Sequence, residues 1–214
     1  PNAKYRKDSI FHLKSVLSHI KKIDKCFIRD HETPPIFIIN VGGWNEDGFL
    51  NKKEKEERYN LLKDSLSQID LSFVNLAIQT MPPFPWHFGG QSFHNLFVSY
   101  NEIDKFCRES GFGICLDVSH SMMACNYYGW KLNDFIKKIG KYVNYLHIVD
   151  AIGADGEGIQ IGQGDVDFDS LGKLLSQECK NVPFIPEIWQ GHKDSGAAFW
   201  SALEFLEPFM RKSS

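Results

Sequence analysis

Three features that would place a chain outside the ordinary globular proteins are missing from this sequence of 214 residues: paired cysteines, an excess of one charge, and a long apolar run. The five cysteines are odd in number and show neither a C-x-x-C motif nor the spacing of a secreted disulfide scaffold. We therefore expect reduced thiols in a cytoplasmic protein. They are Cys26, Cys107, Cys115, Cys125 and Cys179.

Charge is nearly balanced, with 24 Lys and Arg against 27 Asp and Glu, so the net charge is -3. A nucleic-acid partner would need a local basic groove, and the composition gives no sign of one. The clearest uncharged stretch, 81–101, carries Pro, Gly, His and Asn, which argues against a membrane span. At 43% apolar and 24% charged residues, the sequence predicts one soluble domain over 1–214, with no nucleic-acid and no membrane partner.

Apolar, β-branched runs of about six residues recur along the chain, and each is too continuous for a strand that is buried on one face only. Their first residues lie 37, 40, 30 and 39 positions apart, which leaves room for a helix and two loops each time. The pattern predicts parallel strands in a repeated βα unit. The runs are 36–41, 73–79, 113–118, 143–149 and 182–188.

The segments between these runs have the apolar spacing of helices. Ser99 and Glu102 form a capping-box pattern for the third helix, and Gly111 is placed to end it. The expected helices cover the apolar positions of 10–23, 59–69, 103–107, 132–139, 171–175 and 199–206.

Alternating strands and helices build either an open doubly wound sheet or a closed (β/α)8 barrel. No G-x-G-x-x-G follows the first strand, since 41–44 reads V-G-G-W, which disfavours the dinucleotide-binding open sheet. Polar residues instead end every strand, and a barrel gathers such ends at the face that carries its chemistry. The sequence therefore predicts an α/β fold of the barrel type.

Four of the strand-end residues have side chains that ligate metals, and a closing barrel would turn them toward one axis. Oxygen donors with one nitrogen and no thiolate favour Mn, Mg, Co or Zn, so we predict one divalent ion. Taken singly, Asp117 also suits a helix cap and His147 a core position. Glu187 likewise suits an ion pair with Lys193. The predicted ligands are Gln79, Asp117, His147 and Glu187.

Further candidates follow the strands on the predicted loops. His120 and Asp150 each lie three residues beyond a predicted ligand, where they can support the site or face a substrate. Aromatic side chains at a barrel mouth stack on sugar rings, although they also serve as lids that pack the barrel top. The predicted substrate-binding residues are Asn40, Trp86, His87, Asp150, Trp189, His192 and Lys193.

Four short motifs resemble the xylose-isomerase-like barrel superfamily in order and spacing: CLDVSH at 115–120, YLHIVD at 145–150, IGQGDVDF at 161–168 and PEI at 186–188. The resemblance extends from about Arg6 to Leu206. It implies a TIM barrel and a metal-dependent isomerase or epimerase, in which Glu187 moves a proton through an ene-diolate and His120 assists. The superfamily also holds apurinic-site endonucleases.

Segments 81–90 and 186–193 also look like the variant of this barrel that occurs beside, or fused to, nonulosonic (sialic-type) acid synthases. This narrower likeness implies an amino-sugar substrate.

The sequence departs from the family in its site. The family usually has Glu where this chain has Gln79, and an amide can ligate a metal but cannot accept a proton. A non-catalytic sugar-binding or scaffolding module is therefore the alternative to an enzyme. Asn40 stands where the nuclease branch has a metal-binding His, and Gly156 and Gly158 replace its Asp and His. These losses disfavour a phosphodiesterase.

The sequence also departs in length. Five strands are predicted where a barrel has eight, and the chain opens on a helix, so it corresponds to the C-terminal five βα units and lacks roughly the first three. An open five-stranded arc exposes sheet edges. We expect either the N-terminal remainder of a longer polypeptide or a second copy to cover them.

Overall fold

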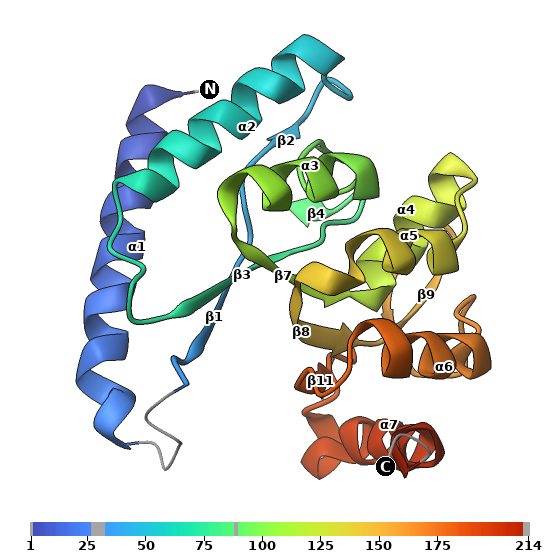
Figure 1. Ribbon diagram of the computed structural model, residues 1–214. Coiled ribbons are helices and arrows are strands. Elements are labelled where there is room, and N and C mark those ends of the chain that lie inside the picture. Colours follow the sequence, from blue (N-terminus) through green and yellow to red (C-terminus); the bar gives the residue numbers. More distant parts are fainter. Residues whose placement is uncertain (1, 27–32, 88–89, 212–214) are drawn as a thin grey trace.

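The computed structural model describes residues 2–26, 33–87 and 90–211 of the chain. Its centre is a sheet of five parallel strands that curve into a half-barrel (Figure 1). The strands follow one another in chain order, which confirms the predicted βα succession and rules out a Rossmann order. They are β1 (Ile36–Ile39), β3 (Asn75–Gln79), β7 (Gly113–Asp117), β8 (Val143–Ile148) and β11 (Phe184–Pro186).

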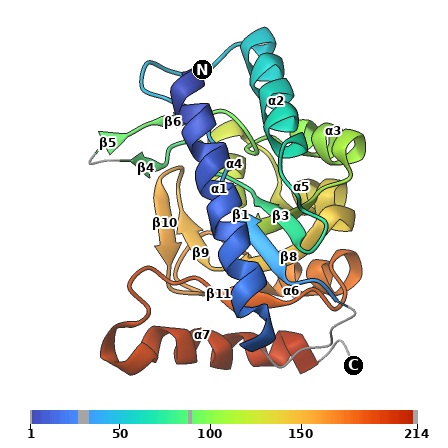
Figure 2. The same cartoon turned by 90° about the vertical axis from the view of Figure 1, so that its left-hand side faces the viewer.

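Helices cover the outer side of this sheet (Figures 1 and 2). Each of the six predicted helices is present, and none in the described part of the chain is long and apolar enough to cross a membrane. The helices of the described segments are α1 (Ala3–Ile23), α2 (Lys52–Ser67), α3 (Tyr100–Ser110), α4 (Val118–Tyr128), α5 (Leu132–Ile139), α6 (Phe168–Glu178) and α7 (Lys193–Arg211), with 3-10 turns at Asp24–Cys26 and Gly140–Tyr142.

Three short antiparallel strand pairs stand on the loops that follow the strands, and the second and third of them are hairpins. They pair β2 (Trp44–Asn45) with β6 (Phe93–His94), β4 (Trp86–His87) with β5 (Gly90–Gln91), and β9 (Asp150–Ile152) with β10 (Gly156–Ile159).

Two local expectations need correction. Helix α4 was not predicted, because it is buried around most of its circumference and so lacks the one-sided apolar spacing of a surface helix. Ser99 does precede α3, but its side chain makes no capping hydrogen bond. A complete capping box occurs instead at α2, between Asn51 and Glu54. The predicted left-handed Gly111 does end α3, with a φ of 76°.

The register between β7 and β8 decides which side chains meet. It shifts between Ile114 and Cys115, and beyond the shift Asp117 lies level with His147. Gly113 is required just below, because a Cβ there would lie 1.9 Å from the Asn144 side chain. The irregularity therefore aligns the two polar strand ends rather than disturbing them.

The two edge strands are open in the described part of the chain, since β1 pairs only with β3 and β11 only with β8. Ile185, in β11, is 45% exposed. All five cysteines lie in described segments and are free thiols. The partner that would cover the open edges remains a prediction.

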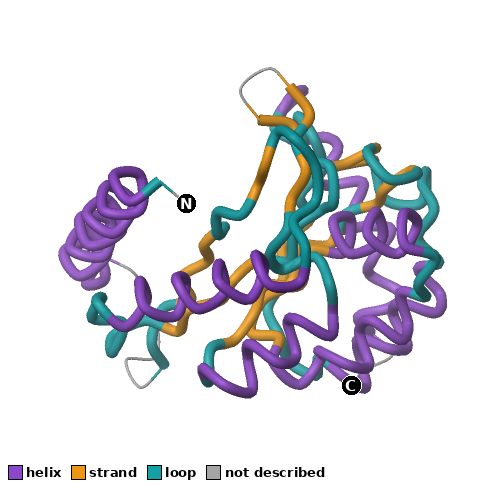
Figure 3. Tube along the Cα trace, turned by 90° about the horizontal axis from the view of Figure 1, so that it is seen from above, coloured by secondary structure: helices purple, strands orange, loops and turns teal. Residues whose placement is uncertain are grey.

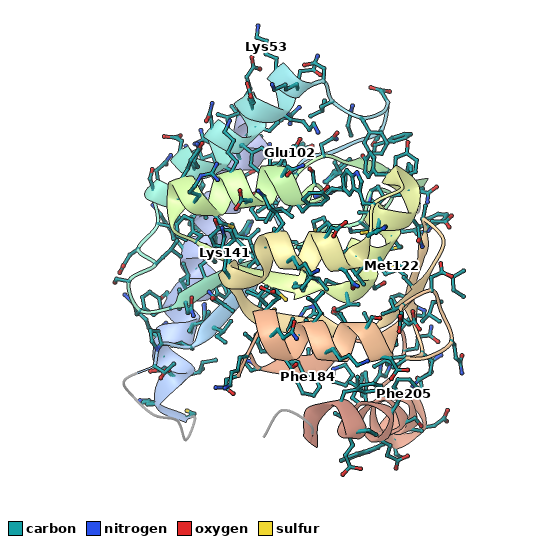
Figure 4. The ribbon with its side chains drawn as sticks, turned by 45° about the vertical axis from the view of Figure 1, so that its right-hand side comes forward. Lys53, Glu102, Met122, Lys141, Phe184 and Phe205 are labelled. Atoms are coloured by element: carbon teal, nitrogen blue, oxygen red, sulfur yellow. The ribbon has the colours of Figure 1, made fainter. Side chains whose placement is uncertain are left out.

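The carboxylate of Asp104 ties α3 to α5 and the 3-10 turn that follows it. Its oxygens accept hydrogen bonds from Tyr142 and Arg108, at 3.0 and 2.9 Å. Lys138 and Lys141 lie 3.5 and 3.4 Å away (Figure 4 labels Lys141). Burial opposes the charge, but the hydrogen bonds from Tyr142 and Lys141 and the charge of Lys138 lower the pKa of Asp104 below its ordinary value.

We expect Asp104→Asn to lower the free energy of unfolding at pH 7 by about 1–3 kcal/mol, because a neutral amide replaces the buried carboxylate that accepts from Tyr142 and Arg108 and faces two lysines. Since the pKa is lower in the folded state, the carboxylate stabilises the fold above the unfolded-state pKa, and this contribution disappears as pH falls through the folded-state pKa. Urea unfolding of both proteins between pH 7 and pH 2.5 should therefore show the difference shrinking. Glu109→Gln, at a partly exposed pair with Lys63, is the control and should have a much smaller effect. A pH-independent difference would contradict this account.

Candidate metal centre

The four predicted ligands converge at the C-terminal ends of four neighbouring strands. Gln79 and Asp117 end β3 and β7, His147 lies in β8, and Glu187 directly follows β11. One ligand atom from each of Asp117, His147 and Glu187 lies within 4.8 Å of the others, and these three form a group that could hold a metal ion.

The contacts within this group are short. The Gln79 amide nitrogen donates to Asp117 Oδ2 at 2.9 Å and lies 3.0 Å from His147 Nδ1. The same Nδ1 is 2.6 Å from Glu187 Oε2 and 3.5 Å from Asp117 Oδ2. Three polar groups thus crowd around one imidazole nitrogen.

With the amide nitrogen of Gln79 toward the imidazole, no single proton arrangement satisfies all of these contacts. If His147 Nδ1 carries a proton for Glu187, two donors face each other where the Gln79 amide approaches. If Nδ1 is bare, its one lone pair must serve both the Gln79 amide and a proton held by Glu187. A divalent ion removes the conflict, since rotation of the Gln79 amide would offer its oxygen alongside two carboxylates and a bare imidazole nitrogen.

The separations also suit a metal. Donors about 2.0–2.2 Å from an ion lie roughly 3–4.4 Å from one another, so small movements of exposed Glu187 would complete the set. The donor set therefore fits the predicted divalent ion.

The electrostatics of the centre favour positive charge at this point. Burial disfavours a charged imidazole, but contacts with Asp117, Cys115 and Glu187 outweigh it and raise the pKa of His147 to about 12. Burial likewise opposes the charge of Asp117, yet His120 and His147 lower the pKa of that carboxyl. Two carboxylates beside one buried nitrogen attract a cation, either a proton or a metal.

Asp117 also has the capping role considered for it from the sequence. Its Oδ1 accepts from the main-chain N–H of His120 at 2.9 Å and so caps α4, while Oδ2 faces the centre. Thr80 Oγ1 accepts from the Asp117 main-chain N–H at 2.9 Å. Thr80 could not be singled out from the sequence, because a threonine after a strand has no chemical signature.

His120 is buried beside the centre, and both of its ring nitrogens have partners. Nδ1 lies 2.7 Å from the Thr80 carbonyl oxygen and Nε2 lies 2.9 Å from Glu157 Oε1. Burial opposes charge on this ring, but Asp117 and Glu157 raise its pKa to about 9. Glu157 comes from the β9–β10 hairpin, a glycine-rich loop in which sequence reasoning did not select it. The catalytic role of His120 remains a prediction.

Asp150 is completely buried and organises a loop. Its carboxylate oxygens accept hydrogen bonds from the main-chain N–H groups of Ala151, Gly162, Gly164 and Val166, at 2.8–3.0 Å. A carboxylate with this many partners holds the segment that follows β10 in place. A substrate contact for Asp150 remains a prediction.

The remaining predicted substrate residues lie on exposed loops. Asn40 follows β1, and Trp86 is 65% exposed on β4. The side chain of His87 lies outside the described residues. Elsewhere on these loops aromatic rings pack closely, with Phe84 and Tyr127 centroids 4.7 Å apart. Whether Trp86 stacks on a sugar or packs as a lid remains a prediction.

The loop after Glu187 carries the other three predicted residues. Trp189 is 76% exposed, and its main-chain N–H donates to the Gly158 carbonyl at 2.9 Å, so the loop leans on the β9–β10 hairpin. His192 and Lys193 are also exposed, and Lys193 donates to Gln190 rather than to Glu187.

Backbone strain is concentrated in this loop. Gln190, Asp194 and Ser195 adopt left-handed φ angles of 56°, 50° and 59°, a conformation that costs non-glycine residues about 1–2 kcal/mol each. The right-handed part of α7 begins only after this turn.

Comparison with known proteins now assigns the fold. The family model of the xylose isomerase-like TIM barrel matches residues 4–209. The chain belongs to this family. No curated protein matches the chain, and neither the family model nor the solved structures below point to nonulosonic acid synthases, so that narrower likeness finds no support.

Several solved structures have a similar fold, although their sequences are only 13–15% identical to this chain. A D-tagatose 3-epimerase-like protein is 15% identical with a TM-score of 0.70, and the match covers 99% of this chain and 72% of that one. D-psicose 3-epimerase from Clostridium cellulolyticum H10 is also 15% identical, with a TM-score of 0.66 and the same coverage. An L-ribulose 3-epimerase is 13% identical with a TM-score of 0.59, covering 85% and 62%. The chain thus spans 62–72% of the length of these barrels.

Excess Mn or Co should raise the melting temperature, because a ligand that binds only the folded state stabilises it by mass action, by about 2.7 kcal/mol at 100 times Kd. For a chain of this size that is a shift of roughly 5–10 °C. Asp117→Ala or Glu187→Ala should abolish the shift, and Gln79→Glu should enlarge it, since a carboxylate binds the ion more strongly than an amide.

Differential scanning fluorimetry with and without metal measures these shifts, and Glu57→Ala, an exposed carboxylate on α2, is the matched control. The absence of any shift, together with no metal by elemental analysis after loading, would refute the metal centre.

Proposed function

We propose that this chain is a metal-dependent isomerase or epimerase that acts on a sugar or sugar derivative through an ene-diolate. The single observation that carries the proposal is the convergence of Asp117, His147 and Glu187 at the C-terminal face of parallel strands. Membership of the xylose isomerase-like family and the sugar epimerases among its structural neighbours support it.

The side chains divide into two that would hold the metal ion and one that also transfers a proton. Asp117 and His147 are buried, with 2% and 10% of their side-chain surface exposed, whereas Glu187 is 53% exposed. Glu187 is therefore the carboxylate that a substrate can reach, and it removes the proton from the carbon next to the carbonyl and later returns it. A divalent ion in this centre would polarise the carbonyl and hydroxyl oxygens of the sugar.

Gln79 limits what the centre can do. Inversion at a carbon needs proton transfer on both faces of the ene-diolate, and an amide cannot accept a proton at neutral pH. The amide can still donate a hydrogen bond to an oxygen of the substrate once it is released from Asp117. Glu187 alone can return the proton to the neighbouring carbon on the same face. Isomerisation therefore needs fewer proton carriers than epimerisation.

A non-catalytic sugar-binding module is the second candidate, and Gln79 is the observation that favours it. The phosphodiesterase reading remains disfavoured, because Asn40, Gly156 and Gly158 offer no imidazole or carboxylate for further metal ions.

Incubation in D2O with Mn or Co and a ketose such as D-tagatose or L-ribulose tests the proposal. Proton NMR should show deuterium entering at a carbon next to the carbonyl. Glu187→Gln should slow the exchange by about 10²–10⁴-fold, the usual contribution of a positioned base.

Glu57→Gln, on the exposed face of α2, serves as the control and should exchange at the wild-type rate. If a sugar binds, as seen by line broadening, but no exchange occurs with any ketose, the module is correct and the enzyme proposal is wrong.

A further inference from the structure

Helix α1 has two neighbouring rows of side chains along its length, and only one of them is used by the fold. The inner row packs on the body through Ile10, Leu13, Leu17 and Ile20, which contact a small cluster around Ile69 and Val74. In Figure 3, α1 lies at the side of the molecule with no other element beyond it. Its outer side is therefore open.

The adjacent row, here called the outer row, consists of exposed residues. Its residues are spaced alternately by four and three positions, which is the a/d spacing of helices that pair side by side. Tyr5, Val16 and Ile23 of this row are 70%, 47% and 49% exposed. The outer row consists of Tyr5, Ser9, His12, Val16, His19 and Ile23.

The outer row is symmetric about the level of residue 14. An antiparallel second helix of the same sequence would place Tyr5 opposite the partner's Ile23, and the large apolar residues at the two ends would cover each other. By the same symmetry, Val16 would pack on the aromatic ring of the partner's His12. Self-complementarity of this kind is what a two-fold interface requires.

Charge along one flank of the row is complementary in the same register. Asp8 and Lys22 lie on that flank, one near each end of the helix, with Ser15 midway between them. In the antiparallel pairing centred on residue 14, Asp8 would lie about 3 Å along the axis from the partner's Lys22, within reach of that long side chain, and the symmetry repeats this pair at the other end. In a parallel pairing this flank would instead face the opposite flank of the partner, so Asp8 and Lys22 would not meet.

We propose that the outer row of α1 is an interface between two copies of this chain, which pair through antiparallel α1 helices. A helix of 21 residues is about 31 Å long, and one helix pair buries less than a standard interface of roughly 1,600 Å². The polar Ser9, His12 and His19 weaken it further. The dimer is therefore reversible, with a Kd on the order of micromolar.

Sedimentation velocity between about 1 and 300 μM, without added metal, tests the interface. Wild-type chain should change from monomer to dimer in this range. Val16→Asp should raise Kd at least tenfold, because it places a carboxylate in the middle of the apolar contact. Lys14→Asp, exposed on another side of the same helix, is the matched control and should leave Kd unchanged.

Charge reversal tests the register without altering the apolar contact. Asp8→Lys or Lys22→Asp alone should raise Kd roughly three- to tenfold, whereas the double variant should return it to near the wild-type value. Both reversals disfavour the helix dipole, so recovery in the double variant cannot come from a more stable helix. Circular dichroism confirms that each variant is folded.

A chain that stays monomeric at 300 μM overturns the proposal. So does a dimer that Val16→Asp leaves intact, since its contact would then lie elsewhere, for example at the open sheet edges. Failure of the double variant to recover overturns the antiparallel register.

Discussion

The alignment of Asp117 with His147 across β7 and β8 is the constraint on which the candidate centre depends. A register one residue different would turn one of the two side chains to the helix-covered face of the sheet. The shift at Ile114 and Cys115, with Gly113 beneath the Asn144 side chain, fixes this alignment. Asp117 then serves two structures at once, because one oxygen caps α4 and the other belongs to the centre. The fold and the chemistry therefore share one carboxylate.

The spacing of apolar residues was sufficient to predict the helices that bury one face and the strands that are covered on both faces. All five strands of the main sheet and six of the seven helices in the described segments follow from it, and the polar strand ends located the centre. Helix α4 escaped because it is buried nearly all round, so its apolar residues have no preferred side. Thr80 and Glu157 escaped for a different reason. Each acts through a contact with a residue distant in sequence, Thr80 with Asp117 and Glu157 with His120, and such contacts leave no local pattern.

Gln79 separates this centre from one built of two carboxylates. In the structure its amide donates to Asp117 and crowds the imidazole of His147, so it lowers the negative charge of the centre while keeping a polar group in place. The likeness in fold to sugar 3-epimerases does not imply epimerisation, because Gln79 is an amide and cannot accept a proton on the second face of a sugar carbon. Fold and reaction course are thus set by different residues of the same strands.

The position of Glu187 has a consequence for how the molecule comes apart. It follows β11, an edge strand that is held by main-chain hydrogen bonds to β8 alone in the described part of the chain. The contact of Glu187 with His147 is a second interaction that holds β11 against β8. A cation bound at the centre would therefore stabilise β11, the last strand, against local unfolding. Binding of a cation at the centre would slow amide hydrogen exchange in β11 by a larger factor than in the rest of the sheet.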